Sequence, residues 1–95
     1  MERVSTTFWN DFGCADRFGV KAIKDTYNRA FSEWKSRYEY LTELVMVLNH
    51  KIWQHYEHGN QTYASLYNQL WQQADGYAME HLSGKELEFF LAVTD

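Results

Sequence analysis

A chain of 95 residues is long enough to build one core and too short for two, so we expect a single helical domain over residues 1–95. The net charge of −4 argues against a nucleic-acid binder, and the single cysteine, Cys14, excludes an intramolecular disulfide. No apolar run approaches the ~18 residues of a membrane span, and residues 1–12 lack the basic-then-apolar order of a signal peptide. These features predict a cytoplasmic protein that does not contact a membrane.

The charge is distributed unevenly along the chain. Residues 16–37 carry six basic and three acidic groups, whereas residues 38–95 carry two basic and eight acidic groups. The first segment therefore has a net charge of +3 and the second a net charge of −6. An asymmetry of this kind predicts a molecule with two differently charged faces.

The first helical signals lie in the N-terminal third. Residues 6–19 predict one or two short helical turns, with Thr6 or Thr7 as the cap. From Gly19 onward, apolar residues recur at spacings of three and four, which predicts an amphipathic helix that ends near Arg37. Its apolar stripe consists of Val20, Ile23, Tyr27, Phe31, Trp34 and Tyr38.

A second helix is predicted over about residues 39–58, with Gly59 as its C-terminal cap. Met46 and Trp53 lie about 120–140° from Leu41 around this helix and give it a second, partly apolar face. Because a helix that is apolar on two sides usually lies between neighbours, we expect it to be the central helix. Its main face comprises Leu41, Leu44, Val45, Leu48, Ile52 and Tyr56.

Two further helices follow. Asn60 is placed to cap the first of them, and Gly76 within it predicts a close helix contact. Its broad apolar face comprises Tyr63, Leu66, Tyr67, Leu70, Ala74, Tyr77 and Ala78. Ser83 and Glu86 form a capping box that opens a short last helix through Leu87, Phe90 and Leu91. The predicted fold is therefore all-α, a compact bundle of three longer helices with short helical segments at both ends.

Three of the four histidines fall within residues 50–58, which raises the question of a metal site. On a helix only His55 and His58 share a face, and His50 points to the far side. Zinc needs three or four convergent ligands, so a third would have to come from His81 or from an acid on another helix. We expect His55 at the edge of the core, the other two in solvent, no metal and no cofactor.

Catalytic patterns are absent from the sequence, which has no glycine-rich phosphate loop, nucleophile elbow or zinc motif. Asp11 and Asp16 lie near Cys14 and would weaken its thiol as a nucleophile. Glu39 and Glu43 form an i,i+4 carboxylate pair, which on an amphipathic helix is ordinarily a solvated edge. We therefore expect no enzyme and no catalytic residue.

Aromatic residues make up 18% of the chain, the most unusual feature of its composition. Most fall on predicted core stripes, but Trp9 and two further tryptophans are less firmly placed inside. Exposed aromatic rings are typical anchors of protein interfaces. The sequence therefore favours a non-enzymatic module that binds another protein as a regulator, adaptor or inhibitor, with candidate partner-binding residues Met46, Trp53 and Trp71.

DNA binding is the alternative function. Part of residues 14–30 resembles the first helix and turn of a helix-turn-helix motif, through Ala15, Phe18, Gly19 and Val20. Asp25 and Asn28 stand where the motif has apolar residues, so the resemblance does not extend into its second half. A DNA-binding accessory protein would use the basic helix around residues 17–37, with candidate contacts Arg17, Lys21, Lys24 and Arg29.

Three segments resemble a family of small hypothetical helical proteins encoded on conjugative and other mobile elements of gut bacteria: ADRFGVKAIKDTYNRAFSEWK, YLTELVMVLNHKIWQHYE and YAMEHLSGKELEFF. The resemblance covers most of residues 6–95 and brings no functional motif, so no binding residue follows from it. It implies an accessory protein of mobile DNA inside a bacterial cell, where small acidic proteins sometimes inhibit host defence enzymes. An exposed aromatic patch with an acidic rim would favour protein binding, and a continuous basic face would favour DNA.

Overall fold

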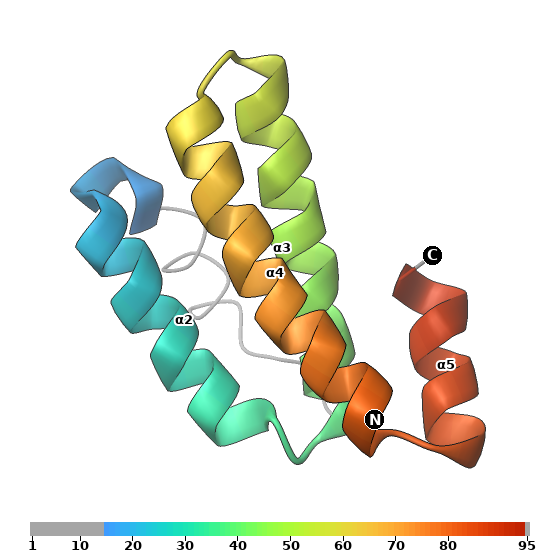
Figure 1. Ribbon diagram of the computed structural model, residues 1–95. Helices are drawn as coiled ribbons and strands as arrows, with labels where there is room; N and C mark the ends of the chain where they lie inside the picture. Colours follow the sequence, from blue (N-terminus) through green and yellow to red (C-terminus); the bar gives the residue numbers. More distant parts are fainter. Residues whose placement is uncertain (1–14, 95) are drawn as a thin grey trace.

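Four α-helices and one 3-10 turn make up the part of the chain that the structure, a computed structural model, describes, residues 15–94. They are η1 (Ala15–Phe18), α2 (Val20–Trp34), α3 (Tyr38–Glu57), α4 (Gln61–His81) and α5 (Gly84–Thr94). Figure 1 shows α3 and α4 side by side, with α2 on one side of the pair and α5 on the other. The predicted all-α bundle of three longer helices with short helical segments at both ends is confirmed.

Helix α2 follows η1 after Gly19, whose φ of 98° lies in the left-handed region that favours glycine. Its inner face buries Ile23, Tyr27 and Ala30, as the apolar period predicts. Val20, expected on the same stripe, is exposed. The helix ends at Trp34, one turn before the predicted end, because the Arg37 N–H donates to the Trp34 carbonyl and closes a turn. Thr6 and Thr7, the predicted caps, lie outside the described residues.

The turn between α3 and α4 has the capping pattern that its sequence predicts. Gly59 has a φ of 75°, the Asn60 N–H donates to the His55 carbonyl at 2.8 Å, and the Gly59 N–H donates to the Tyr56 carbonyl at 3.1 Å. This pair of bonds is a Schellman motif that ends α3. The Asn60 side chain then accepts from the Tyr63 N–H and caps α4. Both predicted caps are confirmed.

The core lies where α3 meets α2, α4 and α5, so the central position predicted for α3 is confirmed. Tyr27 from α2, Tyr67 from α4 and Phe90 from α5 are fully buried, and aliphatic residues of α3 fill the space between them. Aromatic pairs tie the helices at the edges, with ring centroids 5.3 Å apart for Phe31 and Tyr77 and 5.5 Å apart for Trp34 and Tyr40. The buried α3 residues are Tyr40, Leu41, Thr42, Leu44, Val45, Leu48 and Lys51.

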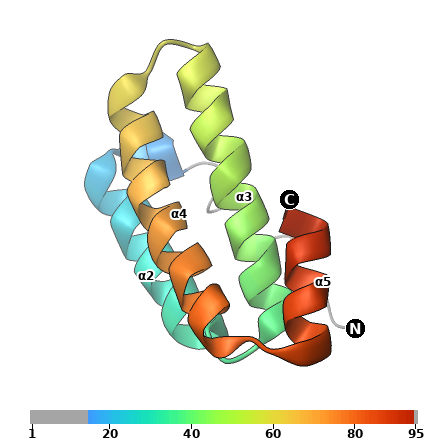
Figure 2. The same cartoon turned by 45° about the vertical axis from the view of Figure 1, so that its right-hand side comes forward.

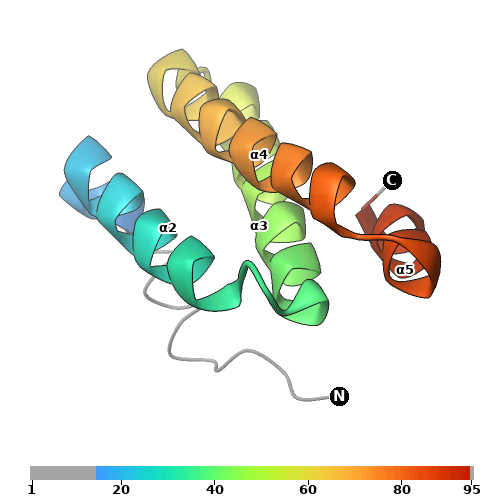
Figure 3. The ribbon, with the colours of Figure 1, turned by 60° about the horizontal axis from the view of Figure 1, so that its bottom comes forward.

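Helix α5 is short and leaves part of α3 uncovered. Its Phe90 is buried in the core and Phe89 packs edge-on against Tyr38, with ring centroids 5.7 Å apart. Figures 1 and 2 show α5 beside the N-terminal half of α3, ending near the middle of that helix. From below, α2 and α5 flank the α3–α4 pair on opposite sides (Figure 3). Among the described residues, no helix therefore covers the C-terminal half of α3 on the side where α5 lies.

Three expectations from the sequence are wrong. Tyr56, assigned to the main apolar face of α3, is exposed. Gly76 does not mark a close contact, because a Cβ built there meets no atom within 4 Å. Glu43 is not a solvated edge residue: it is half-buried, and its Oε2 has no hydrogen-bond partner among the described residues.

Candidate protein-binding surface

Trp53 and Tyr56 form an exposed aromatic pair on the C-terminal half of α3. Their ring centroids lie 5.9 Å apart with the ring planes at 76°, the edge-to-face arrangement that aromatic pairs prefer. Trp53 is 56% exposed and Tyr56 is 62% exposed. One more large apolar residue of α3, Met46, is 43% exposed and lies two turns before Trp53 on the same side. We call Met46, Trp53 and Tyr56 the aromatic face.

The length of α5 explains why Tyr56 is uncovered. Tyr56 follows Tyr38 by eighteen residues, about five helical turns, so the two residues point to the same side of α3. At Tyr38 that side is covered by Phe89 of α5. With 11 residues, α5 is about 16 Å long and does not extend as far as Tyr56. The helical period predicts the direction of this side chain correctly, but it does not predict how far the neighbouring helix extends.

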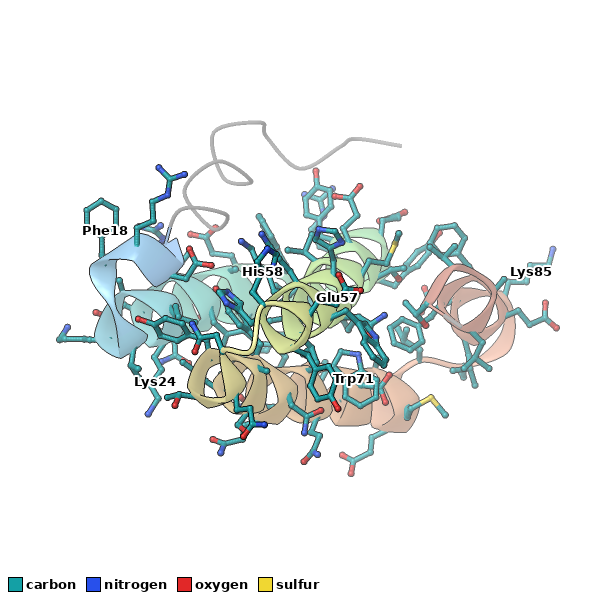
Figure 4. The ribbon with its side chains drawn as sticks, turned by 90° about the horizontal axis from the view of Figure 1, so that it is seen from above. Phe18, Lys24, Glu57, His58, Trp71 and Lys85 are labelled. Atoms are coloured by element: carbon teal, nitrogen blue, oxygen red, sulfur yellow. The ribbon has the colours of Figure 1, made fainter. Side chains whose placement is uncertain are left out.

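Trp71, the third candidate partner-binding residue, lies on α4 and is partly buried against the core. Figure 4 shows it beside the α3–α4 pair, on the side of α5. It therefore differs from Met46 and Trp53, which are exposed. Trp71 can form the edge of a surface whose exposed centre is the aromatic face.

Two carboxylates adjoin the aromatic face on α3: Glu57, one turn after Trp53, and Glu43, one turn before Met46. Helix α4 has no lysine or arginine, and the only one in α3, Lys51, is buried. Glu57 is exposed and Glu43 is half-buried, and Asp75 of α4 is also half-buried. Partial burial raises the pKa of the Asp75 carboxyl above its ordinary value. A partner at this face thus meets aromatic rings and carboxylates, without exposed lysine or arginine from α3 or α4.

A polar cluster lies on the opposite side of α3. Asp16 of η1 accepts from Lys51 Nζ at 3.3 Å, and its Oδ2 also lies 2.8 Å from His55 Nε2. The His55 ring stacks on Tyr67 at an interplanar angle of 12°. Burial and, less strongly, the Asp16 charge raise the pKa of the Tyr67 hydroxyl. The sequence did not single out this cluster, because it joins residues that lie 35 and 39 positions apart.

The four histidines have separate structural roles. His55 lies at the edge of the core and His50 and His58 are exposed, as predicted. His58 Nδ1 lies 2.7 Å from the Gln54 carbonyl in the last turn of α3, and His81 Nδ1 lies 2.9 Å from the Tyr77 carbonyl in the last turn of α4. Such contacts satisfy carbonyls at helix ends. Within residues 15–94, no three side chains of the metal-ligating types gather into a group.

The candidate nucleic-acid contacts are all exposed. Arg17 lies on η1, whereas Lys21, Lys24 and Arg29 lie on α2. Lys21 Nζ lies 2.6 Å from Asp25 Oδ2, which raises the pKa of the lysine through the hydrogen bond and the adjacent charge. Arg29 is four residues from Asp25 and four from Glu33, so acids interrupt the basic side of α2. The cations gather mainly at the start of this helix.

The described residues enclose no pocket. None of the described helices combines the length and apolar character needed to cross a bilayer. Comparisons of the chain with protein-family models, with curated proteins and with solved structures found no match.

Proposed function

We propose that this chain is a non-enzymatic protein-binding module and that its binding surface is the aromatic face of α3. The observation that carries the proposal is the Trp53–Tyr56 pair, two large rings that are more than half exposed on a regular helix. Tryptophan and tyrosine are enriched among interface hot spots, because they bury a large area at little cost in side-chain entropy. A helix also holds both rings in a fixed relation, so little ordering is needed on binding.

The charges around the aromatic face indicate the chemistry of the partner. Exposed Glu57 and half-buried Asp75 lie on α3 and α4, which together present no exposed lysine or arginine. A partner segment with apolar side chains at its centre and basic groups at its edge would be complementary. In the mobile-element setting that the sequence resemblance implies, such a module would act inside the cell as a regulator, adaptor or inhibitor.

Photo-crosslinking in the native host tests the proposal. A photoreactive residue at His50, which is exposed and one turn before Trp53, is compared with one at Gln72, which is exposed on α4. We expect position 50 to give a specific protein adduct that position 72 does not give, and Trp53→Ala to abolish it. Identical adducts from both positions, an adduct that survives Trp53→Ala, or no adduct at all would refute the proposal.

DNA binding through the start of α2 is the alternative function. It is supported by the exposure of Arg17, Lys21, Lys24 and Arg29. Two observations count against it. Asp25 and Glu33 interrupt the basic side of α2. The buried residues of α2, Ile23 and Tyr27, also do not stand at the positions where a helix-turn-helix motif has its apolar residues. Replacing Lys21, Lys24 and Arg29 together with Gln separates this function from protein binding.

A further inference from the structure

A third exposed aromatic residue of the described chain lies far from the aromatic face. Phe18, at the end of η1, is 79% exposed, the largest exposed fraction among the large apolar residues of the described chain. Val20, two residues later, is 40% exposed. Arg17 is the sequence neighbour of Phe18, Lys21 and Lys24 lie within about one turn of Val20, and all three cations are exposed. We call Phe18, Val20 and these three cations the Phe18 end; it is an apolar centre with a basic rim.

The Phe18 end and the aromatic face lie on opposite sides of the bundle. Lys51 points from α3 toward η1, where it pairs with Asp16. Trp53 follows Lys51 by two residues and therefore points about 160° away from it. Figure 4 agrees, with Phe18 projecting outward on the side of η1 and α2, opposite α5. One molecule cannot bring these two surfaces together, so a contact between them requires two molecules.

We propose that the Phe18 end of one copy binds the aromatic face of a second copy, head to tail. The inference rests on the proposed function of the aromatic face as a protein-binding surface, and it names a second copy as an occupant. Phe18 and Val20 supply the apolar centre that Trp53 and Tyr56 would cover. Arg17, Lys21 and Lys24 supply the basic rim that meets exposed Glu57, one turn after Trp53.

Charge favours this pairing over a symmetric one. Two aromatic faces placed against each other would bring their Glu57 carboxylates together, without an exposed lysine or arginine from α3 or α4 to offset them. Two Phe18 ends would bring their cations together in the same way. Head-to-tail contact instead brings opposite charges together. In a head-to-tail dimer, one Phe18 end and one aromatic face remain unoccupied, so further copies can add to form rings or open chains.

Sedimentation of the purified full-length chain over a range of concentrations tests the inference. We expect a mass that rises with concentration and falls at high salt, because the rim contacts are charged. Phe18→Ser and Trp53→Ala should each weaken the association by about 30-fold or more, as loss of a hot spot does. Met79→Ala, an exposed apolar residue of α4 outside both surfaces, is the matched control and should leave the mass unchanged.

Mixing the two variants gives the decisive measurement. Phe18→Ser retains the aromatic face and Trp53→Ala retains the Phe18 end, so their mixture should form a dimer of one copy each and grow no further. A wild-type chain that stays monomeric at millimolar concentration would overturn the inference, as would association that survives Phe18→Ser. Phe18-dependent binding of the monomer to anionic lipid vesicles would also overturn it. If the chain is monomeric but crosslinks a host protein at position 50, only the self-association fails and the proposed function stands.

Discussion

Lys51 of α3 and Asp16 of η1 form an ion pair that holds η1 against the C-terminal half of α3. Their Nζ and Oδ2 atoms lie 3.3 Å apart, and the side chains are only 10% and 13% exposed. His55, one turn after Lys51, contacts the same carboxylate oxygen at 2.8 Å. Because an ionised carboxylate only accepts hydrogen bonds, the His55 ring must carry a proton on Nε2 to donate to it. The pair holds the Phe18 end in place relative to the core.

Replacing Lys51 with Met should therefore lower the free energy of unfolding by about 3 kcal/mol, because among the described residues it leaves the mostly buried Asp16 carboxylate with His55 alone. Urea denaturation measures the effect. Lys85→Met on the exposed surface of α5 is the control and should change stability by less than about 0.5 kcal/mol. Adding Asp16→Asn to Lys51→Met should recover part of the loss. Equal effects of Lys51→Met and Lys85→Met would show that the pair does not stabilise the fold.

Phe90 is the buried ring of α5. Phe90 is fully buried, whereas Val93 on the same helix is exposed. Phe90→Ala should therefore lower the free energy of unfolding by about 3–5 kcal/mol, the range for truncation of large buried aromatics. Val93→Ala should change it by less than about 0.5 kcal/mol. Thermal and urea unfolding that do not distinguish these variants would contradict the packing of α5 against α3 and α4.

The helices and the caps at the α3–α4 turn were predictable from the sequence because they follow from local rules. The apolar period gives α2, α3 and α4, and Gly59 and Asn60 mark the turn between the last two. The exposure of Tyr56 was not predictable, because it depends on where α5 ends beside α3. The pairing of Lys51 with Asp16 was not predictable either, because only the tertiary fold brings them together.

Alkaline pH should unfold the protein through its buried tyrosines. Burial raises the pKa of the Tyr27 and Tyr67 hydroxyls above their ordinary value of 10.0, because the ionised form is poorly solvated in the core. Above about pH 10 the unfolded chain loses these protons and the folded chain keeps them. The free energy of unfolding should then fall by about 1.4 kcal/mol per pH unit for each tyrosine.

Tyr27→Phe tests this pH dependence. Its hydroxyl oxygen is buried without a hydrogen-bond partner among the described residues, so its removal should change stability little at neutral pH. Above pH 10 the variant should lose stability less steeply, by about 1.4 kcal/mol per pH unit. Tyr56→Phe, at an exposed ring, is the control and should keep the wild-type slope. If stability falls equally steeply with pH in the wild type and in Tyr27→Phe, the raised pKa of the Tyr27 hydroxyl is contradicted.

A variant of α2 without three of its cations separates DNA binding from protein binding. Lys21, Lys24 and Arg29 are exposed, so replacing all three with Gln should leave the melting temperature nearly unchanged. We expect the wild-type chain to bind duplex DNA negligibly at physiological salt, because acids interrupt its basic side and the net charge is −4.

The same triple variant should weaken self-association and reduce its salt dependence, because two of its three residues belong to the basic rim of the Phe18 end. If α2 instead bound DNA, log affinity would fall by about 0.9 per phosphate contact for each decade of salt, and the triple variant would flatten that slope by up to about three. Fluorescence anisotropy with labelled duplex at several salt concentrations measures both quantities. Sub-micromolar, salt-sensitive binding that the triple variant abolishes, with Trp53→Ala having no effect, would move the functional surface from α3 to α2.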